Sequence, residues 1–318
     1  MKKSIIIVVL TLLLIIGFSY NYFSESIDIG VERNSYTIHE IDYIERPYNS
    51  PEHQSLEVWY DVDENDYPLF YWSRDQESYY HPVAIAQKAI VWLDGYVQTG
   101  NTEYLERAER YTRKVYDESI ERDGVLLFPY VFDFPLHGIE AALMEAPWYS
   151  AMAQGQVLTL FTRLYDATGE EAYLEKAEKT FRSLRVPEEM LLEDWVVIVD
   201  EENYLWLEEY PLDHLPNHGS QALNGFIFAI YGLYDYYLTT EDPEAKQILQ
   251  ASITTIERYI EDFRAPGEIS YYSLAHFVQS GRYHMIHIDQ LYMLYEITGE
   301  EYFKEMAEAF EEDYIGEH

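Results

Sequence analysis

The sequence predicts an all-α fold, an (α/α) toroid or incomplete barrel of helical hairpins, and two observations support this prediction. A pattern of Thr-Gly, a short acidic stretch and an amphipathic helix occurs at 99–111, 168–181 and 298–310, with a looser copy at 239–250. A strongly apolar segment precedes each copy. Units that pair an apolar helix with an amphipathic one bury their apolar faces by stacking on one another. We therefore expect hairpins around an axis, with the apolar helices inside.

The first 75 residues precede this repeat and divide into two parts. Two lysines are followed by an apolar run from Ile5 to Phe18, and no small-residue cleavage pattern follows it. This favours an uncleaved signal anchor at 1–23 over a cleaved signal peptide, and in either case an extracytoplasmic main domain. Membrane contact is thus expected through this segment. Residues 24–75 lack a helical period and predict short strands and loops.

The toroid domain is expected to span 76–318. Thr-Gly ends a helix because glycine accepts the left-handed conformation, and acidic residues favour the start of the next helix because of its dipole. The connections at 117–150, 185–222 and 263–286 are long for a compact domain and rich in histidine, tyrosine and proline. Loops of this length are usually functional, so we expect them to rise at one end of the toroid and to carry the site.

Composition limits the classes of function. There are 58 acidic and 21 basic residues, a formal net charge of −37, and such a surface repels nucleic acid. The absence of cysteine excludes disulfides and thiol catalysis. No phosphate-binding loop, dinucleotide fingerprint or metal signature occurs, so we expect neither a cofactor nor a metal. Most of the thirty-two tyrosines are expected to be structural, and a few in a wet cleft can do chemistry.

Five segments carry a resemblance to a known family. They are PWYSAMAQGQ from 147, LEEYP from 207, LNGFIFAIYGLYD from 223, SYYSLAHF from 270 and YHMIHIDQL from 283. In this order and with comparable gaps they resemble the C-terminal catalytic region of the D-glucuronyl C5-epimerase family. The resemblance covers about residues 76 to 312.

The resemblance implies an anionic polysaccharide substrate in which a uronate residue is inverted at C5, as from D-glucuronate to L-iduronate. Inversion removes a proton next to a carboxylate and returns one on the opposite face, so two acid/base groups must flank the sugar. The family's functional tyrosines correspond to Tyr210, Tyr272 and Tyr283, and Glu209 is a further acid/base candidate. We expect the hydroxyls of Tyr210 and Tyr283 to face one cavity from opposite walls, with Tyr272 close to one of them.

Substrate contacts are expected from aromatic, amide and basic side chains of the same segments. These candidates are Trp148, Tyr149, Gln154, Gln156, Arg163, Asn224, His276, Arg282, His284 and His287. The basic members, with His214 and His218, are expected to form a cationic rim, because a polyanion is otherwise repelled by the acidic exterior. Packing is an equal alternative for Trp148 and Tyr149, and for the two glutamines it is the favoured one.

Other functions remain open from the sequence. A polysaccharide lyase starts with the same C5 proton abstraction. A toroidal glycoside hydrolase needs two carboxylates around the scissile bond, for which Glu208, Glu209 and Asp235 are candidates. A non-catalytic, membrane-tethered glycan-binding protein is the third alternative. The oligomeric state, a homodimer included, is not determined by the sequence.

Overall fold

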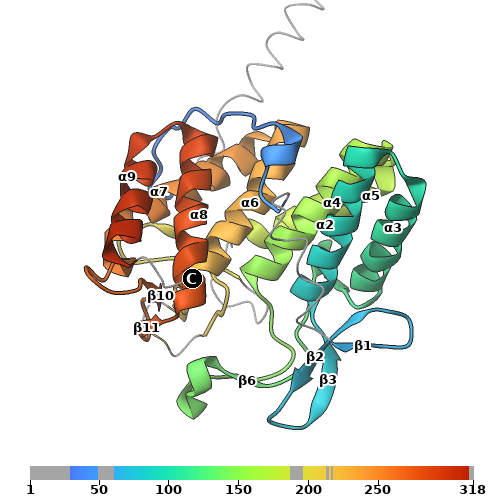
Figure 1. The fold of residues 1–318 in the computed structure, drawn as a ribbon, viewed down its shortest axis with the longest axis horizontal. Coiled ribbons are helices and arrows are strands. Elements are labelled where there is room, and N and C mark those ends of the chain that lie inside the picture. The colour runs from blue at the N-terminus through green and yellow to red at the C-terminus, as the bar shows by residue number, and fades with distance from the viewer. Residues whose placement is uncertain (1–28, 49–60, 187–195, 213–214, 216–217, 315–318) are drawn as a thin grey trace, which may run out of the picture.

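The computed structural model describes residues 29–48, 61–186, 196–212, 215 and 218–314. Within these residues eight α-helices form four hairpins (Figure 1). The first helices of the hairpins are α2 (Pro82–Thr99), α4 (Ala151–Thr168), α6 (Leu223–Thr240) and α8 (Gly281–Thr298). Their partners are α3 (Thr102–Asp117), α5 (Glu171–Phe181), α7 (Pro243–Phe263) and α9 (Glu301–Asp313).

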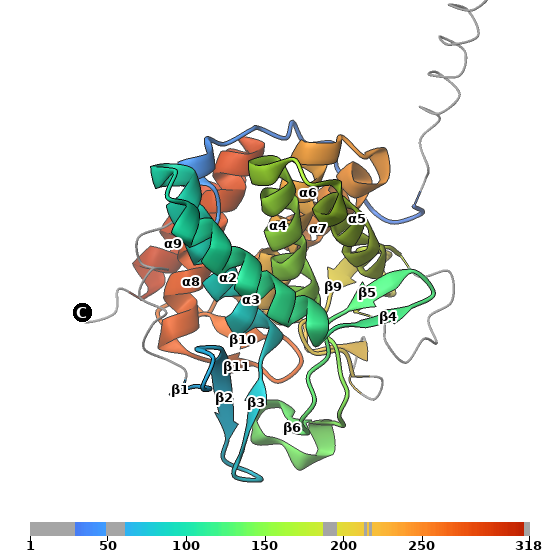
Figure 2. The same cartoon turned by 90° about the vertical axis from the view of Figure 1, so that its right-hand side faces the viewer.

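The first helix of each hairpin lies inside and packs on the next, α2 on α4, α4 on α6 and α6 on α8. The four hairpins therefore follow one another in an arc, which Figures 1 and 2 show from two sides. The closest approach is between α4 and α6, where a side chain at Gly155 would lie 2.5 Å from the Ala229 Cα. A side chain at Gly232 would lie 2.2 Å from the Gly155 carbonyl oxygen, so this contact depends on both glycines.

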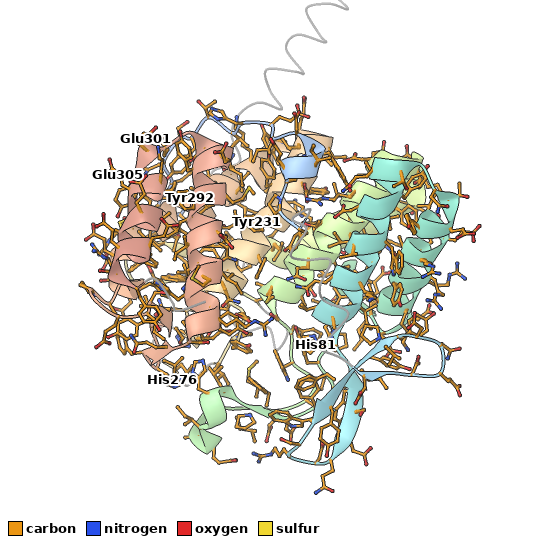
Figure 3. The ribbon with its side chains drawn as sticks, in the orientation of Figure 1. His81, Tyr231, His276, Tyr292, Glu301 and Glu305 are labelled. Atoms are coloured by element: carbon orange, nitrogen blue, oxygen red, sulfur yellow. The ribbon has the colours of Figure 1, made fainter. Side chains whose placement is uncertain are left out.

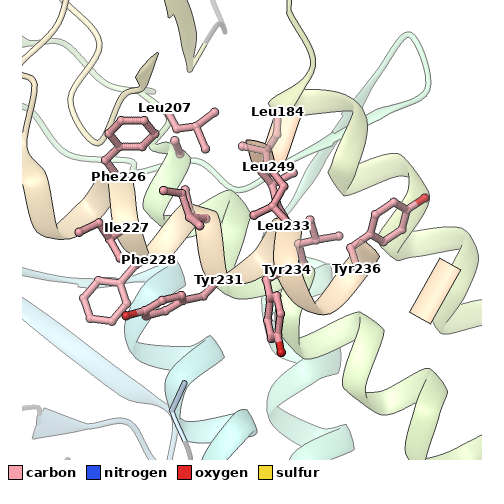
Figure 4. Packing of buried hydrophobic residues seen from close by; sticks show 14 of the residues in the cluster. Leu184, Leu207, Phe226, Ile227, Phe228, Tyr231, Leu233, Tyr234, Tyr236 and Leu249 are labelled. Atoms are coloured by element: carbon pink, nitrogen blue, oxygen red, sulfur yellow. The ribbon is translucent and has the colours of Figure 1, made fainter. Parts of the chain in front are cut away.

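The predicted Thr-Gly terminators act as predicted. Gly100, Gly169 and Gly299 cap α2, α4 and α8 in the left-handed conformation, with φ of 68°, 71° and 71°. At the looser copy Glu241 takes the same conformation after α6, and the side chain of Asp242 then caps α7. The inner helix α6 carries buried apolar and aromatic side chains on several sides (Figure 4), in keeping with its nearly continuous apolar sequence.

The all-α prediction needs one correction, because four two-stranded antiparallel sheets occupy the connections between the hairpins. A three-stranded sheet precedes α2, mostly within the region for which short strands were predicted. Short strands form in these segments because the segments are rich in aromatic and β-branched residues between tight turns and lack a helical period. The three-stranded sheet contains β1 (Asp61–Val62), β2 (Pro68–Trp72) and β3 (Glu77–Tyr80). The two-stranded sheets pair β4 (Ile120–Arg122) with β5 (Val125–Leu127), β6 (Phe134–Pro135) with β7 (Leu143–Met144), β8 (Val197–Val199) with β9 (Leu205–Leu207), and β10 (Tyr271–Ser273) with β11 (Val278–Gln279).

Residues 29–48, which we name the N-terminal strap, run across the C-terminal halves of the inner helices (Figure 1). The strap bonds to all four hairpins. These bonds include Arg33 to Gln247 of α7 at 2.7 Å, the His39 N–H to the Ile297 carbonyl of α8 at 2.8 Å, the Ile41 N–H to the Tyr234 hydroxyl of α6 at 2.9 Å, Tyr43 to Asp94 of α2 at 2.7 Å, and Arg163 of α4 to the Pro47 carbonyl at 2.8 Å. The strap therefore ties the arc together on one side.

The predicted signal anchor at 1–23 lies outside the described residues. Across the part of the chain that is described, no helix combines the length and apolarity that a membrane span needs.

Candidate active site

A cavity of about 410 Å³ opens at the N-terminal ends of all four inner helices. Its volume is within the range of small-molecule sites. The described residues that line it are Phe70, His81, Val83, Gln87, Tyr130, Phe132, Phe134, Trp148, Ser150, Met152, Glu209, Tyr210, Asn224, Phe228, Arg282, Tyr283 and Ile286. Residues of the long connections therefore meet at one end of the arc, which is where the sequence predicted the site.

Glu209, Tyr210 and Tyr283 line this cavity together, and Tyr272 contacts them without being a lining residue itself. The Tyr272 hydroxyl donates a hydrogen bond to Glu209 Oε2 at 2.9 Å and lies 3.4 Å from the Tyr210 hydroxyl. Its ring centroid is 4.6 Å from that of Tyr283. Tyr272 thus contacts all three others, and the four candidates form one cluster. Whether the hydroxyls of Tyr210 and Tyr283 approach a sugar from opposite walls stays a prediction.

The hairpin β8–β9 determines which of two neighbouring glutamates reaches the cavity. Side chains alternate along an extended chain, so Glu208 and Glu209, just after β9, point to opposite sides. Glu208 turns away, and its carboxylate accepts hydrogen bonds from the Gln221 N–H at 3.1 Å and the Ser220 hydroxyl at 3.2 Å. Glu209 lies against the start of α6, where a side chain on Gly225 would be 2.2 Å from Glu209 Oε2. Gly225 therefore makes room for the carboxylate.

Burial changes the proton affinity of these groups. It raises the pKa of Glu209 to about 7, although hydrogen bonds from Tyr272 and Tyr210 oppose the increase. Burial, helped by the negative charge of Glu209, raises the pKa of Tyr210 and of Tyr272 well above 10. At neutral pH the two tyrosines therefore hold their protons, while Glu209 exchanges its own readily.

Arg163 does not line the cavity, which corrects its expected place in a cationic rim. Its side chain projects from α4 and is fully buried. The guanidinium pairs with Asp235 of α6 at 2.9 Å and lies 3.8 Å from Asp94 of α2. Burial raises the pKa of Asp94 to about 6, and Arg163 opposes this. A buried arginine needs such partners because desolvation of an unpaired charge is very costly. Arg163 and Asp235 therefore serve the interior of the arc.

His284 and His287 are also absent from the cavity wall. Both are buried and bond to Ser270, with Nδ1 to Oγ distances of 3.0 and 2.8 Å. Burial lowers the pKa of His287 to about 3, which keeps the ring neutral at pH 7. They fix the segment before β10 to α8, and the predicted rim does not include them.

His276 lies between β10 and β11, near the lower edge of the view in Figure 3, and outside the cavity wall. Its Nδ1 is 2.9 Å from the Nδ1 of His137, whose ring packs edge-on against Tyr272 at 5.6 Å. The His276–His137 contact therefore supports the tyrosine cluster from outside. His218 is not among the lining residues, and His214 lies outside the described residues.

Of the remaining candidates, Trp148, Asn224 and Arg282 line the cavity, whereas Tyr149, Gln154 and Gln156 do not. The amide of Gln154 bonds to the Phe128 N–H at 2.9 Å and the Leu126 carbonyl at 2.8 Å, which is the packing role that the sequence also allowed. Gln156 is buried between helices. Arg282 is the one lysine or arginine in the wall among the described residues, so the predicted rim is reduced to a single cation.

Sequence reasoning missed several residues of the wall. His81 accepts a hydrogen bond from the Ala84 N–H at the start of α2, and burial lowers its pKa to about 4. His81 directly precedes Pro82, and a proline before an apolar segment marks the start of a helix. This pattern could have placed His81 at the start of an inner helix. One side of the cavity, which we name the aromatic wall, is formed by Phe70, Phe132, Phe134 and Trp148. Phe134 stacks on Tyr210 with ring centroids 5.6 Å apart.

Solved structures share the fold of helical hairpins. A sugar epimerase from a ruminal bacterium has a TM-score of 0.55 at 16% identity and covers 83% of this chain and 68% of its own. Cellobiose 2-epimerase from Bacillus thermoamylovorans has a TM-score of 0.53 at 15% identity and covers 80% and 66%. At such low identity the likeness shows the fold alone.

Sequence relatives are more informative about the family. An uncharacterized protein of Methanocaldococcus jannaschii is 29% identical over 214 residues, which are 65% of each chain. The D-glucuronyl C5-epimerase of Caenorhabditis elegans is 26% identical over 171 residues, or 48% of this chain and 26% of that protein. The matches thus span less than two thirds of either relative. The family described as D-glucuronyl C5-epimerase C-terminus matches residues 122–312, well over half of the chain. This protein therefore belongs to the D-glucuronyl C5-epimerase C-terminus family.

Proposed function

We propose that the protein is a carbohydrate epimerase that inverts C5 of a uronate residue within an anionic polysaccharide. The observation that carries this proposal is a single buried carboxyl, Glu209, with its pKa raised to about 7, in one cavity with Tyr210 and Tyr283 and in contact with Tyr272. Family membership and the fold support the same class of reaction.

Glu209 is assigned as the base. The C5–H bond breaks, its proton passes to the Glu209 carboxylate, and the electron pair moves into the substrate carboxyl group to give an enediolate. A base works best when its pKa is near the working pH, and an ordinary glutamate is about two to three pH units too weak. The raised pKa of Glu209 removes most of that mismatch.

A tyrosine is assigned as the acid on the opposite face. Tyr272 bonds to Glu209 and lies beside Tyr210, so these two hydroxyls belong to the surroundings of the base. Tyr283 enters the cavity from a different element, the first turn of α8. We assign it the proton that returns to C5. The phenolate then regains a proton and Glu209 loses one, which completes the cycle.

The contents of the cavity do not favour a hydrolase. Two carboxylates roughly 5 to 9.5 Å apart are needed to cleave a glycosidic bond. Among the described lining residues Glu209 is the one acid, because Glu208 turns toward Ser220 and Asp235 pairs with Arg163. A lyase begins with the same proton abstraction as an epimerase, so the two activities must be distinguished by their products.

The test is incubation of the protein with uronate polymers in deuterated water. An epimerase incorporates deuterium at C5 and yields two C5 configurations in the NMR spectrum, with no new chain ends. A lyase produces an unsaturated end that absorbs ultraviolet light. Absence of C5 exchange across unsulfated and sulfated uronate polymers contradicts the proposal and leaves glycan binding without catalysis.

A further inference from the structure

The start of helix α4 has an unusual cap. Ser150 occupies the N-cap position and lines the cavity, yet its side chain makes no cap hydrogen bond. The residue is 1% exposed, and within the described structure Ser150 Oγ has no hydrogen-bond partner. A serine at this position normally accepts a bond from the N–H two or three residues later. Here the hydroxyl of a residue of the cavity wall is instead buried without a partner.

The backbone of α4 adds further donors at the same place. The Ala151 N–H donates to the Glu208 carbonyl at 2.8 Å. The N–H groups of Met152 and Ala153 belong to the first turn, which has no acceptor within the helix, and no side chain caps them. Because α4 is 18 residues long, its N-terminus also carries the positive end of a full helix dipole. Such an end binds anions.

The neighbouring helix α6 shows why α4 is the available end. Glu209 packs against the first turn of α6 at Gly225, so a carboxylate of the protein already occupies that terminus. Within the described residues no acidic side chain bonds to the start of α4 in this way. The Glu208 carbonyl accepts a hydrogen bond there, but only from the Ala151 N–H.

We propose that the carboxylate of the substrate uronate binds at the start of α4, where it accepts hydrogen bonds from the Ser150 hydroxyl and the N–H groups of Met152 and Ala153. This inference rests on the proposed function and names the anion site of the same cavity. A carboxylate matches these groups because it is an acceptor only, while the groups at the helix start are donors.

The position also suits the chemistry. The bond between Ala151 and Glu208 holds the start of α4 beside the residue that precedes the base Glu209. C5 is bonded directly to the carboxyl carbon, so a carboxylate bound at the start of α4 holds C5 in the cavity that Glu209 also lines. Charge grows on the carboxyl oxygens as that proton leaves. Donors aimed at these oxygens therefore bind the enediolate more tightly than the substrate and accelerate the reaction.

The experiment compares Ser150→Ala with Asp242→Ala. Asp242 caps α7 by accepting from the Glu244 and Ala245 N–H groups at 2.7 and 3.0 Å, and it is not part of the cavity wall. Ser150→Ala is expected to lower kcat about 100-fold with a smaller change in KM, and to leave the melting temperature unchanged, because Ser150 caps nothing. Asp242→Ala is expected to lower the melting temperature by about 2 to 4 °C and to retain kcat.

A binding measurement separates this inference from the proposed function. NMR titration with methyl β-D-glucuronide and methyl β-D-glucoside measures the preference for a carboxylate without any turnover. The wild-type protein is expected to prefer the glucuronide, and Ser150→Ala to lose most of this preference. A Ser150→Ala protein with unchanged kcat and glucuronide preference overturns the inference, as does one that loses as much thermal stability as Asp242→Ala. Absence of C5 exchange in the wild type contradicts only the proposed function.

Discussion

Replacement of Glu209 by glutamine is expected to stabilise the protein at alkaline pH while it abolishes epimerisation. Glutamine has the shape of a protonated glutamate, and its carbonyl oxygen can still accept the hydrogen bond that the Tyr272 hydroxyl donates at 2.9 Å. The change therefore removes only the ability to exchange a proton and to carry a buried charge. The direction of the effect follows from the raised pKa of Glu209.

The magnitude comes from the difference between the folded and unfolded pKa values. Burial raises the pKa of Glu209 from 4.5 to about 7, so the folded state holds the proton more tightly. Below pH 4.5 both states are protonated and there is no penalty. As pH rises toward 7 the unfolded chain loses its proton first, and the folded state is weakened. Relative to glutamine the penalty is about 1 kcal/mol at pH 5 and about 3 kcal/mol at pH 8.

The assay is denaturant unfolding of both proteins at several pH values, with the free energy of unfolding taken from the midpoint and slope. Glu208, whose pKa burial raises to about 8, titrates in an overlapping range and is present in both proteins. The charge of Glu209 contributes least to that raised pKa, so most of the Glu208 titration cancels in the difference. A difference between the two proteins that does not change from pH 5 to 8, or that favours the wild type at pH 8, refutes the reasoning about Glu209.

Three further outcomes follow from the structure. Tyr283→Phe keeps the ring that packs on Tyr272 at 4.6 Å but removes the hydroxyl, so NMR should show epimerisation abolished while the melting curve is retained; full activity contradicts the assignment. Arg163→Met leaves the buried Asp235 without its 2.9 Å partner and should cost about 3 to 5 kcal/mol of unfolding free energy, with unchanged kcat per folded molecule. Because the net charge is −37, kcat/KM on an anionic glycan should rise when ionic strength increases from about 0.02 to about 0.2 M, and a fall would indicate a cationic docking surface.

The hairpin repeat could be predicted from sequence because its signals are local. Thr-Gly before an acidic stretch marks a helix end, and Gly100, Gly169 and Gly299 adopt the left-handed conformation that this requires. The small sheets were less visible. Strands of two or three residues such as β6 and β7 are shorter than the four or more residues over which alternation can be recognised.

The acid/base candidates were predicted through the family resemblance, and the structure does bring Glu209, Tyr210, Tyr272 and Tyr283 together. The cation positions could not be predicted in this way. Arg163 is a lone cation in an apolar helix, and this pattern fits both a substrate clamp and a buried ion pair. Its partner lies 72 residues away, and nothing in the sequence joins them.

The role of Ser150 could not be predicted from the sequence either. A serine just before an apolar helix predicts an N-cap, and Ser150 does occupy that position. Whether a cap serine bonds to its own helix or faces a cavity depends on a rotation of one side chain, which sequence patterns do not record. The missing cap bond becomes visible only with the surrounding wall in place.

The position of the strap has a consequence for how a long sugar chain is handled. The strap lies across one end of the arc's axis, and Tyr48 reaches inward to stack on Phe228, a residue of the cavity wall, with ring centroids 5.6 Å apart. Among the described residues the strap covers this end, so if the proposed function holds, a glycan reaches the cavity from the other end, at the N-termini of the inner helices.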